Sequence, residues 1–294
     1  MMEKIAVSII TYNEEERISI VLKSVAKFDF VLVIDKSSTD RTREIAESMG
    51  AKVIQVPYTD NDPEYNRVVA AEELKKQGFK WRLGLTCSDV CHKDLYDAIS
   101  KAVNDYAKNA DAVQIPYIQY SMGLTGKNTY YNKSKTKPSL VKIDSLQYST
   151  EVHGFGIKTD AIYASLMITD KKIAVYHLTH ETLDNIMERH IRYAKNIAVT
   201  RWNSGRTKER ELRSCTIAVI RHVLDYVKLG IFKKKWDGLA QFFMLLMYYS
   251  MIYLFTYFDE KKSAEIIEQY DELRESLLGK SYEHKKQTKE DKNN

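Results

Sequence analysis

Two stretches decide the fold: IAVSIITYNEEERI at residues 5–18 and FVLVIDKSSTDRTREIAES at residues 30–48. Each begins with an unbroken apolar run, typical of a strand buried on both faces, and continues into polar residues and a helical pattern. The alternation repeats, with strands predicted at 52–56 and 81–86 and helices predicted at 14–27, 39–49, 63–77 and 93–106. Strands that alternate with helices of this length predict βαβ units and a parallel sheet, so the fold class is α/β.

The second half of the chain has a different pattern. Residues 112–177 read as strands and loops, and the remainder is almost entirely helical, with helices predicted at 182–203, 209–229, 236–258 and 260–277. We therefore expect a sheet domain over residues 1–180, a helical region over 181–278 and a disordered polar tail over 279–294.

The composition excludes several protein classes. The chain has 294 residues, of which 44% are hydrophobic and 29% charged, with only 4 Pro, which excludes a disordered or collagen-like protein. Three cysteines are too few for a disulfide framework and favour a reducing compartment. The N-terminus shows no long apolar run, so we expect no signal peptide and a location that is either cytoplasmic or peripheral on the cytoplasmic membrane face.

Charge is concentrated in one segment. Residues 201–235 hold ten basic and three acidic side chains, and residues 239–258 that follow hold no charged one. The apolar segment is long enough to span a bilayer, but its four tyrosines also suit a helix lying in the membrane interface or packed in a core or homodimer; these alternatives stay open. The basic run suits an anionic lipid surface, and without a nucleic-acid-binding motif beside it we expect no nucleic-acid partner.

Polar residues follow three of the predicted strands, at residues 11–14, 35–40 and 86–89. Since the carboxyl ends of parallel strands meet at one edge of a sheet, these residues are candidates for binding a nucleoside or a divalent cation. Asp40 has the alternative role of capping the next helix. No Gly-rich phosphate loop is present, which argues against P-loop and dinucleotide-binding folds.

The two opening stretches resemble the N-terminal signature of family 2 glycosyltransferases, whose GT-A fold is a Rossmann-like nucleotide-diphospho-sugar transferase fold. The segment WRLGLTCSDVCHKDL (81–95) resembles that family's tryptophan-led strand and metal-binding acidic motif. The segments EVHGF (151–155) and AVYHLTHETLDNIMERHIRYA (174–194) are similar to later motifs of a lipopolysaccharide-core-biosynthesis-like branch. The segment VLDYVKLGIFKKKWDGLAQFFMLLMYY (223–249) is similar to the membrane-proximal helices of that branch.

The resemblance implies an inverting glycosyltransferase that moves a sugar from a nucleotide-sugar donor to a lipid-linked or surface-polysaccharide acceptor. A divalent cation, Mn²⁺ or Mg²⁺, would stabilise the charge that develops on the donor diphosphate. The implied donor-binding residues are Thr11, Tyr12, Glu14, Asp35 and Ser88.

The resemblance also implies metal-binding and catalytic residues. Asp89 and His180 would hold the cation, Asp89 and Glu151 would be catalytic with Glu151 as the base, and His153 and His177 would contact the acceptor or the diphosphate. Arg189, Arg192 and Lys195 are further candidates for phosphate contacts, with a solvated helix face as the alternative.

The chain departs from the family pattern at several positions. Thr86 and Ser88 stand where the acidic metal motif has two aspartates, and Gly154 stands where the branch has a glutamate. These departures keep two alternatives open, a metal-independent enzyme and a catalytically degenerate GT-A module that binds nucleotide or sugar without turnover. A nucleotidyltransferase is a weaker rival because its phosphate loop is missing, and zinc at Cys87 and Cys91 is disfavoured by their spacing.

Overall fold

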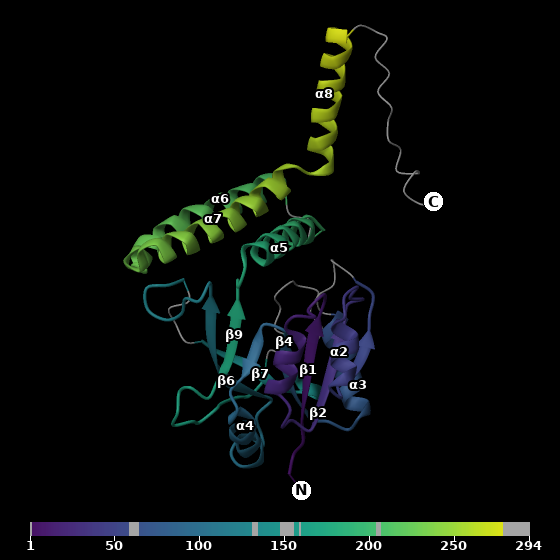
Figure 1. Ribbon diagram of the computed structural model, residues 1–294, viewed down its shortest axis with the longest axis vertical. Coiled ribbons are helices and arrows are strands. Elements are labelled where there is room, and N and C mark those ends of the chain that lie inside the picture. Colours follow the sequence, from purple (N-terminus) through teal and green to yellow (C-terminus); the bar gives the residue numbers. More distant parts are fainter. Residues whose placement is uncertain are drawn as a thin grey trace. The chain divides into compact units, whose positions relative to one another are not determined.

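The computed structural model describes residues 2–58, 65–130, 135–147, 156–158, 160–203 and 207–278 (Figure 1). The backbone forms two compact units. The sheet unit comprises Met1–Arg189 and Arg221–Leu245, and the helical unit comprises His190–Ile220 and Leu246–Asn294.

The sheet unit begins with parallel strands in the order β3-β2-β1-β4 (Figure 1). Their bounds are β1 (Ile5–Thr11), β2 (Phe30–Asp35), β3 (Lys52–Gln55) and β4 (Trp81–Thr86). The register pairs Thr11 with Asp35 and Ile10 with Thr86. The polar ends of three strands, far apart in sequence, therefore lie along one edge of the sheet.

The sheet continues beyond β4 in the order β7-β6-β9-β5, with β8 paired to β6. The bounds are β5 (Asp89–Cys91), β6 (Ala112–Ser121), β7 (Lys135–Lys142), β8 (Tyr163–Ser165) and β9 (Val175–Thr179). Strand β5 runs antiparallel to β9, and their register pairs Asp89 with His177.

Helices cover both faces of the parallel strands because successive side chains of a strand point to opposite faces. Their bounds are α1 (Ile18–Ser24), α2 (Thr42–Ser48), α3 (Tyr65–Lys76) and α4 (Leu95–Asn104). Ile5, Val7 and Ile9 share a buried cluster with residues of α1, α2 and α4. Ala6 and its neighbours from β2 share the opposite cluster with α3. This two-sided burial explains why the strands are apolar throughout.

The C-terminal helices are α5 (Leu183–Asn203), α6 (Lys208–Lys228), α7 (Lys235–Tyr257) and α8 (Glu260–Leu278), with the 3₁₀ turn η2 (Ile231–Lys234) between α6 and α7. We call residues 221–245 the hairpin tip. It belongs to the sheet unit because His222 stacks on Tyr130 at 4.6 Å and the Gln241 side-chain oxygen accepts a 3.4 Å hydrogen bond from the Tyr130 amide.

Gly238 permits the tight turn between η2 and α7. A Cβ at this position would lie 2.2 Å from the carbonyl oxygen of Ile231, closer than any real contact. Only glycine therefore allows the backbone of η2 to approach α7 this closely.

The helical unit has a small core of its own around Ala194, Cys215 and Ile252. Lys208 and Asp259 form an ion pair of 2.7 Å within it. The segment Ile231–Tyr257, which runs through both units, is long and apolar enough to cross a membrane, with a mean hydropathy of 1.5.

The α/β class, the four parallel strands and the C-terminal helices are confirmed. Helix α1 begins at Ile18 instead of residue 14 because the intervening residues form a turn, with the Arg17 and Ile18 amides donating to the Glu14 carbonyl at 2.9 and 2.8 Å. The three-residue strand β5 was not predicted. The predicted tail over 279–294 lies outside the described residues, and the domain boundary at residue 180 stays a prediction.

Candidate active site

The loops after β1 and β2 are joined through the buried carboxylate of Asp35. One of its oxygens accepts a 3.0 Å hydrogen bond from the Ser38 amide, and the other accepts a bond from the Ser38 hydroxyl. That hydroxyl in turn accepts a 2.9 Å bond from the Asn13 amide. Asp35, predicted to bind the nucleoside, thus positions both loops, and its direct contact with a base stays a prediction.

Aromatic side chains lie beside these loops. Tyr12 and Tyr58 are half-buried, with ring centroids 4.4 Å apart, and the ammonium group of Lys36 lies 4.5 Å from the Tyr58 centroid. Thr11, also a predicted donor-binding residue, is buried and accepts a 3.4 Å bond from the Cys87 thiol. The predicted Tyr12 therefore belongs to an aromatic and cationic surface of the kind on which a nucleobase stacks.

Asp40 lies just before α2, whose N-cap residue is Arg41, and joins the start of that helix to the loop after β1. Its carboxylate accepts bonds from the Thr42 amide at 3.0 Å and from the Glu15 amide at 3.1 Å. Burial acts to raise the pKa of Asp40, but hydrogen bonds from Thr42 and Glu15 outweigh it and hold the pKa below its ordinary value.

The buried carboxylate of Asp89 accepts four hydrogen bonds. Its Oδ2 accepts bonds from the amide and the hydroxyl of Thr86, at 2.7 and 2.9 Å. Its Oδ1 accepts bonds from the Tyr117 hydroxyl at 2.9 Å and from Nδ1 of His177 at 2.8 Å. Only 4% of the residue is exposed. Four donors on one buried carboxylate make Asp89 the centre of a rigid polar network.

The network fixes the charge state of Asp89. Burial acts to raise its pKa, but hydrogen bonds from His177, Thr86 and Tyr117 outweigh it, so the pKa of Asp89 lies below its ordinary value. Burial and the Asp89 charge raise the pKa of Tyr117. An ionised carboxylate only accepts, so Nδ1 of His177 must carry a proton, and Nε2 is the nitrogen able to take up another.

A second cluster joins the loop after β1 to the loop after β4 and to α5. Arg17 donates to the Glu14 carboxylate through Nε at 2.8 Å and through Nη2, and Arg189 Nη2 lies 3.5 Å from the other Glu14 oxygen. Both arginines also donate to the Ser88 hydroxyl, at 3.1 and 3.4 Å. The predicted donor-binding residues Glu14 and Ser88 are therefore brought together, with two guanidinium groups beside them.

The described residues do not assemble the cation site predicted at Asp89 and His180. Asp89 already accepts four hydrogen bonds, and Nδ1 of His180 lies 2.8 Å from the Ser121 hydroxyl. Across the described part of the chain, no group of three His, Cys, Asp or Glu side chains is placed to hold a metal ion. The reason is chemical, since Thr86 and Ser88 supply neutral hydroxyls where the family resemblance implies carboxylates.

Cys87 and Cys91 are free and buried. Burial is the main cause that raises the pKa of each thiol to about 12. Thiols with this pKa stay protonated at neutral pH, so they are neither nucleophiles nor good ligands for zinc.

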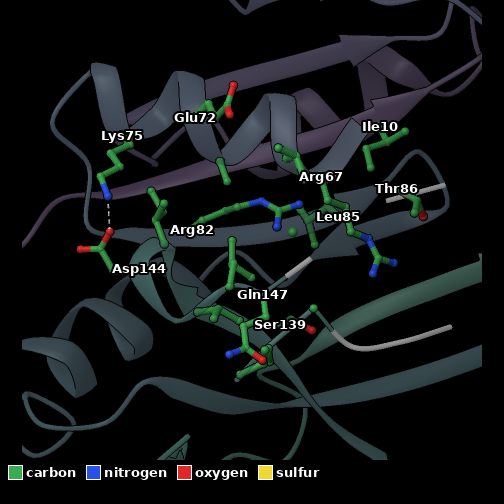
Figure 2. Close-up of a pocket in the computed structure, with 18 residues that line it drawn as sticks. Ile10, Arg67, Glu72, Lys75, Arg82, Leu85, Thr86, Ser139, Asp144 and Gln147 are labelled. Carbon is green, nitrogen blue, oxygen red and sulfur yellow. Dashed lines mark hydrogen bonds and ion pairs between the residues drawn. The ribbon is translucent and has the colours of Figure 1, made fainter. Parts of the chain in front are cut away.

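A pocket of about 430 Å³ opens between α3, β4, β7 and the segment around η1 (Ile143–Ser145) (Figure 2). Its polar lining includes Arg67, Glu72, Arg82, Thr86, Ser139 and Gln147. Arg82 donates to the Ser8 hydroxyl at 2.5 Å, and Gly84 leaves room for its guanidinium, because an added Cβ would lie 3.2 Å from Arg82 Nη2. The pocket reaches Thr86, which is bonded to Asp89, so it extends to the polar edge of the sheet.

Several of these residues were not predicted. Arg82 had a signal, as the one charged residue within the apolar strand WRLGLT, whereas Arg17 and Arg67 lie in helical patterns where charge is ordinary. The predicted base Glu151 and the predicted contact His153 lie outside the described residues.

Comparison with known proteins supports the family suggested by these motifs. Residues 6–164, more than half of the chain, match the family described as glycosyl transferase family 2. An uncharacterized glycosyltransferase of Rickettsia felis is 52% identical over 99 residues, 33% of each chain. The 4,4'-diaponeurosporenoate glycosyltransferase of Staphylococcus haemolyticus is 44% identical over 62 residues, 20% of this chain and 16% of its own length. The matched stretches thus span a third or less of these relatives.

Two solved structures are also similar. S. aureus TarS in complex with UDP-GlcNAc has a TM-score of 0.48 at 19% identity, covering 68% of this chain and 67% of that chain. The second is glucosyl-3-phosphoglycerate synthase from Mycobacterium tuberculosis, in complex with Mn²⁺, UDP and glucosyl-3-phosphoglycerate. Its TM-score is 0.43 at 15% identity, and the match covers 70% of this chain and 81% of that chain.

The strand-end motifs, the α/β sheet and the family match agree with one another. The predicted fold class, a GT-A α/β domain with a C-terminal helical region, is confirmed, whereas the lipopolysaccharide-core-like branch stays a prediction. The chain belongs to glycosyl transferase family 2.

Proposed function

We propose that the protein transfers a sugar from a nucleoside diphosphate sugar to an acceptor hydroxyl, with inversion at the anomeric carbon. The observation that carries the proposal is the strand register, which aligns Thr11, Asp35 and Thr86 along the edge of the sheet where α/β proteins bind nucleotides. Family membership supports the same reaction class.

The donor would bind across the two described clusters. The tilted pair of Tyr12 and Tyr58 offers a stacking surface for the nucleobase, and the guanidinium groups beside Ser88 offer hydrogen-bond donors to the phosphates. Asp35 would act by holding the loops that carry these groups. The pocket that reaches Thr86 supplies room for the remainder of the donor or for the acceptor.

The Asp89–His177 pair supplies a candidate general base. In the transfer step the acceptor oxygen forms a bond to the anomeric carbon while the bond from that carbon to the diphosphate breaks, and the acceptor proton must leave. With Nδ1 bonded to Asp89, His177 would take the proton at Nε2, and Asp89 would stabilise the imidazolium formed. Glu151, the base implied by the family resemblance, is the competing assignment.

The experiment measures sugar transfer to crude lipid extract and hydrolysis of the donor for UDP-, GDP-, CMP- and dTDP-sugars. Calorimetry measures the binding of each donor in parallel. We expect one donor to bind and to turn over, and turnover to fall strongly in His177→Ala if His177 is the base, or in Glu151→Gln if Glu151 is. Binding without turnover would favour the degenerate module, for which the neutral Thr86 and Ser88 are the specific observation. No binding of any donor would refute both functions.

A lipid-linked or surface-polysaccharide acceptor, and with it a place on the cytoplasmic membrane face, is the second part of the proposal. The hairpin tip exposes Trp236 (81%), Val227 (64%) and Phe232 (48%), next to the basic run 233–235. Exposed aromatic side chains flanked by lysines suit insertion at an anionic bilayer surface.

Liposome flotation tests this membrane surface. Each lysine near an anionic surface contributes about 1 kcal/mol, so replacing Lys233, Lys234 and Lys235 by alanine should lower binding to anionic vesicles on the order of a hundredfold. The matched control replaces the exposed Lys23, Lys76 and Lys101 and should change little. Equal flotation of both triple variants would refute the interfacial role, and extraction only by detergent would favour a spanning helix.

A homodimer through the C-terminal helices would instead appear in sedimentation without vesicles.

A further inference from the structure

We propose that the guanidinium groups of Arg17 and Arg189, in place of a divalent cation, neutralise the donor diphosphate. The inference rests on the proposed function, because it describes how the enzyme holds the donor of that reaction. The two arginines meet at the loop after β4, where the family resemblance implies a metal ion.

The two arginines converge on one point of that loop. Arg17 Nη1 donates to the Ser88 hydroxyl at 3.1 Å, and Arg189 Nη1 donates to the same oxygen at 3.4 Å. Ser88 is the position at which the resemblance would place an aspartate ligand. A neutral hydroxyl with two cationic donors therefore stands where a carboxylate would face a metal ion.

The cluster places two cationic side chains against one carboxylate. Arg17 and Arg189 share one carboxylate, that of Glu14, so the three groups together carry one net positive charge. Their side chains are only 12% and 14% exposed, so water screens that charge weakly. A phosphate placed beside Ser88 could accept hydrogen bonds from both guanidinium groups, whereas a divalent cation at the same point would lie next to two cationic side chains.

The cluster also has hydrogen-bond donors to offer. Each guanidinium has five N–H groups in a planar fork that matches phosphate oxygens. The bonds to Glu14 and Ser88 engage Nε, Nη1 and Nη2 of Arg17 but only Nη1 and Nη2 of Arg189. Within the described residues, Arg189 thus keeps the larger capacity to bind a phosphate.

The neighbouring carboxylate is not available to a cation instead. Asp89 follows Ser88 directly, but its two oxygens accept from Thr86, Tyr117 and His177. Binding a metal ion there would break the bond that orients His177. The charge that a metal would supply must therefore come from elsewhere, and the two guanidinium groups are the cations that contact this loop.

The chemistry needs no further reactant. When the bond between the anomeric carbon and the diphosphate breaks, its electron pair stays on the phosphate oxygen, and the nucleoside diphosphate leaves with one more negative charge. Hydrogen-bond donors that are held in place beside Ser88 would stabilise that charge with little rearrangement.

Calorimetry with the full chain tests the inference, using UDP, GDP, CDP and dTDP and the matching nucleosides as probes, each with Mn²⁺ and with EDTA. We expect one nucleoside diphosphate to bind with the same affinity, within about twofold, in both conditions. Arg189→Ala should weaken its binding by about tenfold or more while leaving binding of the nucleoside unchanged, since the lost contacts are to phosphate. Arg189→Lys, which keeps the charge, should lose less.

The matched control is Arg41→Ala, which removes an exposed arginine of the same edge and should bind as the wild type does. Thermal melts show whether each variant is folded. If Arg189→Ala is not folded, the affinity of Arg189→Lys for the nucleoside diphosphate is compared with that of the wild type instead. Tenfold tighter binding with Mn²⁺ than with EDTA, or wild-type affinity in both Arg189 variants, would overturn the inference and leave the proposed function standing. Failure of every nucleotide to bind in either condition would overturn the proposed function itself.

Discussion

Replacing Asp89 by asparagine keeps the shape of the buried side chain and removes its charge. The Thr86 amide at 2.7 Å can only donate, so the asparagine oxygen must take the side of Oδ2. The asparagine NH₂ group then faces Tyr117 and His177. The tyrosine hydroxyl can rotate to accept, but His177 can accept only by moving its proton from Nδ1 to Nε2.

The loss of stability follows from the hydrogen bonds that change. A bond to a charged group contributes about 1.5–3 kcal/mol and a neutral bond about 0.5–1.5 kcal/mol. All four bonds to the side chain lose their charge assistance, and the loss is partly offset because the variant no longer buries a charge, so we expect Asp89→Asn to lower the free energy of unfolding by about 2–3 kcal/mol.

The same charge predicts a pH dependence. Burial opposes ionisation of Asp89 but the hydrogen bonds from His177, Thr86 and Tyr117 prevail, and its pKa lies below the ordinary 3.8. A carboxyl group with a lowered pKa stabilises the fold above its unfolded pKa and loses that contribution as the pH falls through the folded value. The wild type should therefore lose more stability in acid than Asp89→Asn does.

The assay is urea unfolding at pH 7 and in acid, together with sugar transfer. Because Nε2 of the altered tautomer carries a proton, transfer should fall on the order of a hundredfold or more if His177 is the base. Asp97→Asn, at an exposed ion pair with Lys27, is the control and should change neither quantity noticeably. Asp89→Asn with wild-type stability would refute the charge network, and wild-type transfer would remove His177 from catalysis.

Three further outcomes can be checked with single variants or one reagent. Asp35→Ala should unfold about 1–3 kcal/mol more easily and weaken nucleotide binding, because it leaves buried loop donors without an acceptor; unchanged calorimetric affinity would separate Asp35 from the site. Gly238→Ala should lower the melting temperature, since its Cβ would meet the Ile231 carbonyl at 2.2 Å, and an unchanged melt would contradict that close approach. Cys87 and Cys91, whose pKa burial raises to about 12, should react with a thiol reagent at pH 8 only after denaturation, and rapid labelling of the folded chain would show them to be accessible.

The parallel strands and their polar ends were predictable because the signals are local. An apolar run such as residues 30–35 identifies a strand wherever it pairs, and Asp35 at its end must then lie at the carboxyl edge. The predicted Glu14 and Ser88 indeed share one cluster, and the predicted Asp89 contacts His177.

The roles of these side chains were less predictable than their locations. A carboxylate after a strand suggests a metal ligand or a residue that contacts the base, and the structure adds internal hydrogen bonds that Asp89 and Asp35 each accept. Which donors a carboxylate meets depends on loops that are distant in sequence, so no local pattern reports it.

The amino-acid sequence by itself determined the α/β class, the order of strands and helices, the family and the edge at which the polar residues gather. Periodicity and strand-end composition act over a few residues, which is why they can be read directly. The tertiary structure alone decided that β5 pairs with β9 and sets Asp89 against His177, 88 residues away, and that Arg17 and Arg189 meet at Ser88. Those contacts arise from the packing of the whole sheet unit, where a charged group is held by whichever partner the folded chain brings within hydrogen-bond distance.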